Sequence, residues 1–281
     1  MILRPALVLL ASMSFAALGS AELAPLNAAG VAMGHLHYFV RDVEANKRFW
    51  VALGGEAKSI SGIDAIAFPG VLVFLSEGDP AAGTEGSVLN HVAFRVQSVA
   101  AIEARGFEVT HLEQYPGVAY LYTPEGERIE LFDDDLATNL DFTPLGPTAE
   151  PSVARHNVAL DVPIVSHHLH LYVPDVAAAQ EWYAAHFGGV AGMRWRYDAT
   201  DLPGINFNFS AASEPLPGTR GRMLDHIGFE VANIEAFCAA LEARGVRFDV
   251  PYARSASGLG RALLTDPWGT YIELTEGLRD L

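Results

Sequence analysis

The sequence predicts an α+β protein in which four β-α-β-β-β modules pair into two tandem domains. One pattern, a strand that opens near a histidine and is followed by an amphipathic helix and apolar strands, occurs four times, beginning near residues 34, 90, 166 and 225. The second and fourth copies also end in matching acidic strands, RIELFDD at Arg128 and YIELTEG at Tyr271. Internal repeats determine architecture, so they outweigh local signals.

The repeats divide the chain into segments with the following bounds: a leader at 1–21, a first domain at 33–135 with modules 33–77 and 88–135, a linker at 136–165, and a second domain at 166–278 with modules 166–212 and 222–278. The linker is assigned because periodicity disappears there while prolines accumulate, and proline continues neither helix nor sheet. A length of 281 residues agrees with two domains, since one domain averages about 150 residues.

Within the first module, residues 35–40 alternate as a strand, Asp42 is a helix N-cap, and the helix ends at Gly54. The second module repeats this order with Ser98 as N-cap and Gly106 as the helix stop. Modules three and four follow the same plan, so each sheet should carry its helices on one face.

The charge distribution and the single cysteine exclude some classes of function and structure. A formal charge of -16 without long acidic runs indicates a dispersed acidic surface that repels phosphate backbones, so we expect no nucleic-acid partner. Cys238 is the single cysteine and can form no internal disulfide.

The first 21 residues have the composition of a secretory signal. Arg4 precedes an apolar stretch from Ala6 to Leu18, and small residues follow up to Ala21. We therefore expect cleavage after Ala21, a periplasmic or secreted protein, and no stable membrane insertion after cleavage, because a span needs about 18 apolar residues. An uncleaved anchor is the alternative.

Side-chain alternation along the strands places histidines and acids on the face away from the helices. In HVAFRV, the two valines and the phenylalanine share the helix-facing side, so His91 lies on the opposite, concave side. The same parity selects His35, His37, His168, His170, His226, Glu130 and Glu273.

Two imidazoles and one carboxylate on a concave sheet form a facial ligand set that leaves coordination positions open. This suits a catalytic divalent metal, with iron(II) favoured and manganese, nickel, zinc or cobalt as alternatives. A lone histidine is more often a polar residue satisfied by the fold. Three matching residues in each of two domains instead predict one metal site per domain.

The opening strand H-x-x-x-x-V and the endings TPEGERIEL and DPWGTYIEL resemble the vicinal oxygen chelate superfamily of glyoxalase I, extradiol dioxygenases and bleomycin-binding proteins. The resemblance implies two ligand sets: His35, His91 and Glu130 in the first domain, and His168, His226 and Glu273 in the second. It places His37 and His170 in the substrate space, with an exchange of roles within each neighbouring pair left open.

Two further positions bear on the reaction that the resemblance implies. Glyoxalase I takes an additional acid from the end of a module, where this chain has Phe74 in one half and Asn206, Phe207 or Asn208 in the other. Extradiol dioxygenases carry a His and a Tyr before the ligand Glu, which fall on His111 and Tyr120. His111 would move a proton and Tyr120 would hydrogen-bond the substrate. His111 could instead be a surface strand residue.

The expected function is thus an exported, metal-dependent enzyme acting on a small substrate that chelates the metal through neighbouring oxygens. A ring-cleaving dioxygenase-like reaction is favoured over a glyoxalase I-type lyase or isomerase. The alternative class is a non-catalytic protein that binds a drug or metabolite. We expect a monomer or homodimer, and a working site in the first domain, because the second has Leu263 at the Tyr120 position.

Overall fold

The computed structural model describes residues 22–134, 136, 142–144, 160, 162–256 and 258–280. The predicted signal and most of the predicted linker lie outside these residues. Among the residues described, no helix combines the length and apolar character that crossing a bilayer requires.

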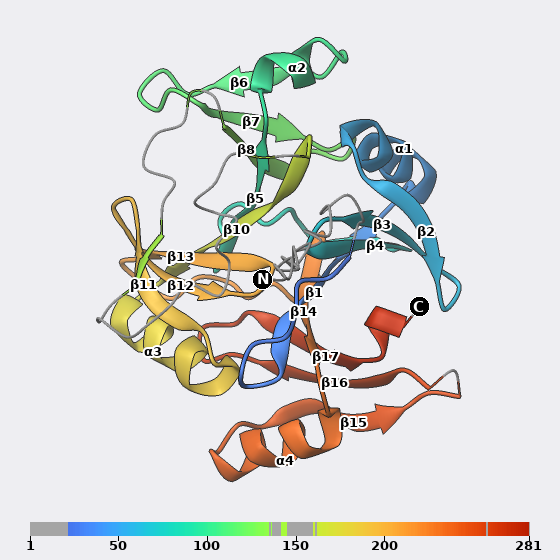
Figure 1. Ribbon diagram of the computed structural model, residues 1–281, viewed down its shortest axis with the longest axis vertical. Coiled ribbons are helices and arrows are strands. Elements are labelled where there is room, and N and C mark those ends of the chain that lie inside the picture. The colour runs from blue at the N-terminus through green and yellow to red at the C-terminus, as the bar shows by residue number, and fades with distance from the viewer. Residues whose placement is uncertain are drawn as a thin grey trace, which may run out of the picture.

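The predicted α+β class with four repeated modules is confirmed (Figure 1). Module 1 comprises β1 (Val31–Val40), α1 (Val43–Leu53), β2 (Glu56–Ile60), β3 (Ile63–Phe68) and β4 (Val71–Glu77). Module 2 comprises β5 (Leu89–Val96), α2 (Val99–Glu103), β6 (Val109–His111), β7 (Val118–Tyr122) and β8 (Arg128–Asp133).

The second half of the chain repeats this order. Module 3 comprises β10 (Ile164–Val173), α3 (Val176–Phe187), β11 (Val190–Arg194), β12 (Tyr197–Leu202) and β13 (Ile205–Ala211). Module 4 comprises β14 (Leu224–Val231), α4 (Ile234–Ala243), β15 (Phe248–Arg254), β16 (Gly260–Thr265) and β17 (Tyr271–Glu276). A short strand β9 (Phe142–Pro144) lies between the halves, and a 3-10 helix, Leu278–Asp280, follows β17.

The helix starts follow the predicted caps with one difference. The Asp42 carboxylate accepts a hydrogen bond from the Ala45 backbone N–H at 2.8 Å. Ser98 occupies the N-cap position of α2, but its side chain makes no capping bond. Instead, the Asp133 carboxylate at the end of β8 accepts a hydrogen bond from the Val99 backbone N–H at 2.7 Å. A carboxylate distant in sequence therefore caps the N-terminus of α2.

The strands pair across the two halves of the chain, which differs from the predicted pairing of modules within each half. Sheet A has the order β15-β16-β17-β14-β1-β4-β3-β2 and joins module 1 to module 4. Sheet B has the order β6-β7-β8-β5-β10-β13-β12-β11-β9 and joins module 2 to module 3. At the centre of each sheet two opening strands run antiparallel, β1 with β14 and β5 with β10. Because all four opening strands carry the same pattern, the repeat alone does not specify which two meet.

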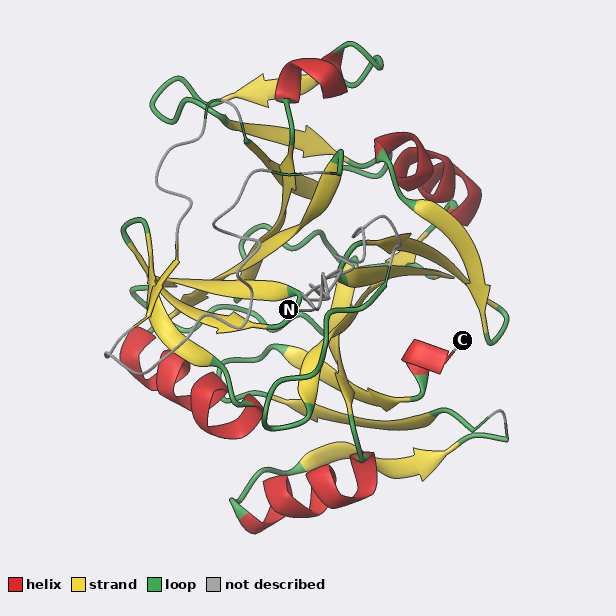
Figure 2. Ribbon diagram, viewed as in Figure 1, coloured by secondary structure: helices red, strands yellow, loops and turns green. Residues whose placement is uncertain are grey.

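Apolar packing connects the modules that strand pairing leaves apart. The buried Trp50 ring of α1 lies 5.8 Å from the ring of Phe94 on β5, and Phe68 lies 5.1 Å from Phe94. In the other half, Phe187 of α3 lies 4.5 Å from Phe229 of β14. Figure 2 shows the helices at the periphery with the strands between them. Modules 1 and 2 therefore share a core, as do modules 3 and 4.

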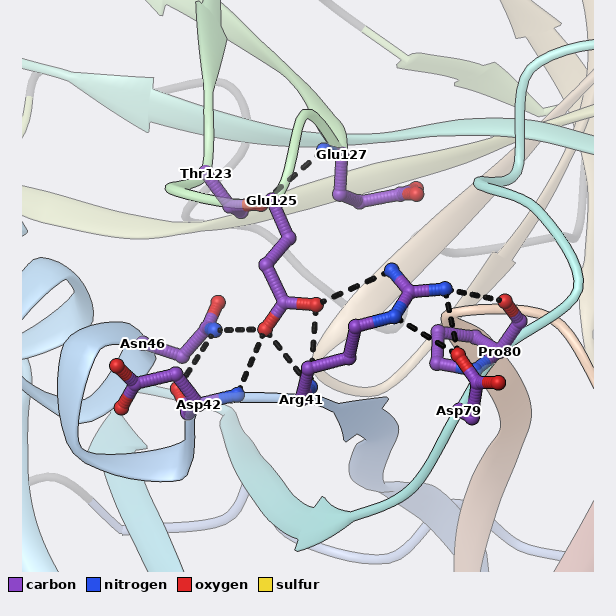
Figure 3. A network of polar contacts seen from close by, with 8 residues as sticks. All are labelled: Arg41, Asp42, Asn46, Asp79, Pro80, Thr123, Glu125 and Glu127. Carbon is purple, nitrogen blue, oxygen red and sulfur yellow. Dashed lines mark hydrogen bonds and ion pairs between the residues drawn. The ribbon is translucent and has the colours of Figure 1, made fainter.

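Polar contacts also link module 1 to module 2 and module 3 to module 4. Glu125, in the turn before β8, accepts hydrogen bonds from the Arg41 backbone N–H and the Asn46 side chain, each at 2.9 Å (Figure 3). In the other half, the Tyr183 hydroxyl donates to the Asp266 carboxylate at 2.7 Å. Each acid belongs to the turn that precedes an acidic strand, so these contacts fix that strand against the helix of the adjoining module.

Candidate metal centres

The strand pairing brings together two His/His/Glu sets that mix residues from both halves of the chain. Site B, on sheet B, contains His91, Glu130 and His168. Site A, on sheet A, contains His35, His226 and Glu273. The six predicted ligand residues are thus all in the two sets. Their predicted grouping by chain half is wrong, because β1 pairs with β14 and β5 with β10.

The sheet register explains how site B forms. On β5, Ala93 is flanked by Glu130 of the parallel strand β8 and by His168 of the antiparallel strand β10. His91 lies two residues before Ala93 and therefore on the same face. The small Ala93 side chain leaves the space between the three larger ones open.

The donor atoms of site B have the spacing that a bound ion requires. His91 Nε2 and His168 Nε2 each lie 3.4 Å from Glu130 Oε1. Two donors bound at about 2.1 Å to one tetrahedral ion lie about 3.4 Å apart. Both Nε2 atoms are buried and have no hydrogen-bond partner among the described residues. Donor chemistry, burial and spacing therefore all fit a divalent metal.

Neighbouring groups orient the ligand rings through Nδ1. His91 Nδ1 lies 2.9 Å from Asn90 Oδ1, and His168 Nδ1 lies 2.7 Å from His167 Nδ1. An Nδ1–H of His91 that donates to the Asn90 oxygen leaves the Nε2 lone pair directed at the site. Such outer partners commonly fix the tautomer of a metal-binding histidine.

A cavity of about 350 Å³ opens beside the site B donors. Its walls are largely aromatic and include Tyr115, Tyr120, Phe132, Tyr172, Trp195 and Tyr197. His170, which the sequence placed in the substrate space, lies on the same wall, with Nε2 2.8 Å from the Ser210 hydroxyl. Burial, together with the nearby His91, holds the pKa of His170 well below its usual range. His170 is therefore a neutral imidazole near pH 7.

The structure separates the two residues predicted to perform the chemistry. Tyr120 on β7 is directly opposite Glu130 on β8, its ring centroid lies 6.4 Å from that of His91, and it lines the cavity. Burial and the Glu130 charge raise the pKa of Tyr120 to about 12, so its hydroxyl is a stable hydrogen-bond donor.

His111 does not reach the site. It pairs with Ala119, the neighbour of Tyr120, and therefore lies on the opposite face of the sheet. Its side chain is 60% exposed, and its Nε2 lies 3.2 Å from Glu103 on α2. The predicted spacing between His111 and Tyr120 missed the strand parity that separates them.

A fourth position beside the donors is occupied by a neutral side chain in both sites. Glu273 pairs with Gly228, two residues after the ligand His226. At the equivalent positions, Asn208 pairs with His170, two residues after His168, and Phe74 pairs with His37, two residues after His35. Asn208 Oδ1 is buried and has no hydrogen-bond partner among the residues described. Of the three residues that the sequence offered, the register places Asn208 at this fourth position near site B.

Site A is more tightly closed. Glu273 Oε2 lies 3.0 Å from His35 Nε2 and 3.2 Å from His226 Nε2, while Glu273 Oε1 lies 2.7 Å from Arg261 Nε. The His35 ring lies over Gly228, where any Cβ would collide with it. The adjoining cavity measures about 100 Å³.

The charges of site A are strongly coupled. Burial opposes ionisation of Glu273, but contacts with His226 and His35 outweigh it and hold the pKa of Glu273 far below its usual range. Burial likewise disfavours the charged form of His226, yet hydrogen bonds with Asp225 and Glu273 raise its pKa above the ordinary value. For His35 burial dominates and lowers the pKa.

His37, the other residue that the sequence placed in the substrate space, lines the site A cavity, and its Nε2 lies 2.9 Å from the Ser76 hydroxyl. Burial, together with the neighbouring His226 and His35, lowers the pKa of His37 to about 3. His37 and His170 are thus related by the repeat, since each faces a serine and lies beside a ligand histidine.

Comparisons with known proteins agree with this architecture. The model of the Glyoxalase/Bleomycin resistance protein/Dioxygenase superfamily matches residues 165–274. The crystal structure of glyoxalase I from Zea mays is 14% identical, covers 89% of this chain and 94% of its own, and gives a TM-score of 0.60. A candidate dioxygenase from Bacillus subtilis is 13% identical over 91% of this chain and 86% of its own, with a TM-score of 0.61. No curated protein sequence matches the chain. At these identities the structural likeness shows a shared fold.

Proposed function

We propose that the chain is a metal-dependent enzyme of the glyoxalase, bleomycin resistance protein and dioxygenase superfamily, also called the vicinal oxygen chelate superfamily, whose model matches residues 165–274, and that it works at site B. Its substrate is a small molecule that binds the ion through two neighbouring oxygens. The observation that carries the proposal is the conjunction of three buried donors, spaced for one ion, with a cavity of about 350 Å³.

His91, His168 and Glu130 would hold the ion, with Asn208 Oδ1 as a further oxygen in reach of the same space. Two imidazoles and a carboxylate are the ligands of iron(II) sites that keep positions open, so iron(II) is favoured over manganese, nickel, zinc or cobalt. When bound, the ion supplies Lewis-acid activation and a template for substrate oxygens.

The side chains of the cavity favour ring cleavage over a glyoxalase-type isomerisation. The fourth position is the neutral Asn208, whereas glyoxalase I has an acid there. Tyr120 is a hydrogen-bond donor placed beside Glu130, and the neutral His170 lies in the wall of the same cavity. In this proposal His170, and not His111, is the histidine beside the substrate. The aromatic walls provide faces for a planar substrate.

The test is a substrate screen with catechols and with 2-oxoaldehydes plus glutathione, under iron(II), manganese, nickel and zinc. Oxygen uptake and product absorbance distinguish ring cleavage from isomerisation. Glu130→Gln should abolish turnover and metal binding at site B. Glu273→Gln, the matched change at site A, should leave turnover in place. Turnover that survives Glu130→Gln but is lost in Glu273→Gln would move the chemistry to site A. Tight binding of a cavity ligand by metal-free protein, without turnover, would favour the binding-protein alternative.

We also propose that the protein is exported, on the basis of the apolar stretch from Ala6 to Leu18 and the small residues that follow. N-terminal sequencing of protein from its native host should find a start near Glu22. A soluble cytoplasmic chain that retains Met1 would contradict the proposal.

A further inference from the structure

Sites A and B carry the same donor residues but differ in what else contacts the carboxylate. In site A, Arg261 Nε lies 2.7 Å from Glu273 Oε1, so both carboxylate oxygens are engaged. In site B, both histidines face the same oxygen of Glu130, and the described residues provide Glu130 with no arginine or lysine ion pair. The two sites therefore differ in whether an arginine forms a direct ion pair with the acid.

The repeat identifies the residue that corresponds to Arg261 in the other site. Leu263 pairs with Glu273 on sheet A just as Tyr120 pairs with Glu130 on sheet B. Two residues earlier on these strands, and on the same face, lie Arg261 and Val118. Site B thus has a neutral Val118 where site A has a guanidinium.

We propose that Arg261 is a tethered cation that takes the place of a divalent ion at Glu273. Site A is then an ion-pair staple, meaning a cluster of charged contacts that holds modules 1 and 4 together. In this proposal only site B binds metal. A guanidinium stays charged at any physiological pH and satisfies a carboxylate oxygen directly. A divalent ion at the same carboxylate would have to displace this cation or be repelled by it.

The geometry supports a staple. Glu273 belongs to module 4 and contacts His35 of module 1, so the cluster closes the junction between β1 and β14. The Glu273 carboxylate is buried, whereas the Arg261 side chain is 52% exposed. Replacing Arg261 should therefore disturb the core little while freeing one carboxylate oxygen.

The experiment exchanges the two equivalent residues and counts bound Mn²⁺ by electron paramagnetic resonance after equilibrium dialysis. Glu130→Gln removes the site B acid, so that metal at site A is measured alone. We expect Glu130→Gln to bind essentially no ion and the double variant Glu130→Gln, Arg261→Val to bind about one ion per chain. Arg261→Gln, which keeps the first methylenes and a polar end but removes the charge, serves in the same background if the valine variant fails to fold. Val118→Arg should remove the site B ion from an otherwise unchanged chain.

Two results would overturn the proposal. One is an ion in Glu130→Gln that disappears on adding Glu273→Gln, since site A would then bind metal with Arg261 in place. The other is a folded Glu130→Gln protein that stays empty with both Arg261→Val and Arg261→Gln. If the wild type binds no ion at site B but Arg261→Val gains one at site A, the proposed function fails while the role of Arg261 stands.

Discussion

Lowering the pH should reduce the free energy of unfolding of the metal-free protein, because the fold keeps several histidines neutral. His37 provides the clearest test. Its pKa falls from an ordinary value of 6.5 to about 3, because the ring is buried beside His226 and His35. The unfolded chain therefore takes up this proton below pH 6.5, whereas the folded chain does not take it up until near pH 3. Stability is fully present above pH 6.5 and is lost as the pH falls through this window.

The magnitude follows from linkage. Each pH unit well below 6.5 costs about 1.4 kcal/mol for one such group, and between pH 7 and pH 5 the cost is about 2 kcal/mol. His35, His168 and His170 have lowered pKa values and act in the same direction. The pKa of His226 is raised, so its contribution is lost above pH 6.5 and adds no slope on the acid side.

Urea unfolding at pH 7 and pH 5, with chelator present, measures the effect. The wild type should lose about 2 kcal/mol more than His37→Gln over this interval. His111→Gln is the matched control, because it makes the same substitution at a histidine whose side chain is largely exposed. Equal acid sensitivity of His37→Gln and the wild type, or an NMR titration of His37 centred near pH 6.5, would refute the reasoning.

Three further changes test other parts of the structure. Tyr120→Phe should lower turnover on a substrate found by the screen while metal content stays constant, and His111→Ala should change neither turnover nor metal content. Kinetics and elemental analysis measure both quantities. Loss of activity in His111→Ala would show that this residue does belong to the site. Phe94→Ala, which removes a ring between Trp50 and Phe68, should cost about 3–5 kcal/mol in urea unfolding, and a cost below 1 kcal/mol would show that modules 1 and 2 do not share a core. Chelating an ion present at about 100 times its Kd should lower stability by about 2.7 kcal/mol in the wild type and not in Glu130→Gln, as thermal melts would show.

The repeat pattern predicted the modules, the concave histidines and both acids because these depend on local sequence. Alternation along a strand determines the face of His91 and Glu130 regardless of what the strand pairs with. Caps such as Asp42 depend only on the next few residues, and Asp42 does bond the Ala45 N–H.

Module pairing and the environment of each site could not be predicted in this way. The opening strands at His35, His91, His168 and His226 carry equivalent patterns, so the choice among partners depends on long-range packing. The prediction that His111 lies in the site was wrong, because the spacing between His111 and Tyr120 in the sequence does not give the register of their strands. The observed register, which pairs Tyr120 with Glu130 and His111 with Ala119, is what places His111 on the helix face.

The nested order of strand pairing bears on how the chain assembles. The contact of β5 with β10 joins residues roughly 80 positions apart, and the contact of β1 with β14 joins residues roughly 190 apart. Loop-closure entropy differs by less than about 1 kcal/mol between them, so equilibrium stability hardly distinguishes the two junctions. Synthesis does distinguish them, because β14 emerges last and leaves the edge of β1 unpaired until then. We expect sheet B, with the cavity beside site B, to be completed while the chain is still being synthesised, and the pairing of β1 with β14 to form last.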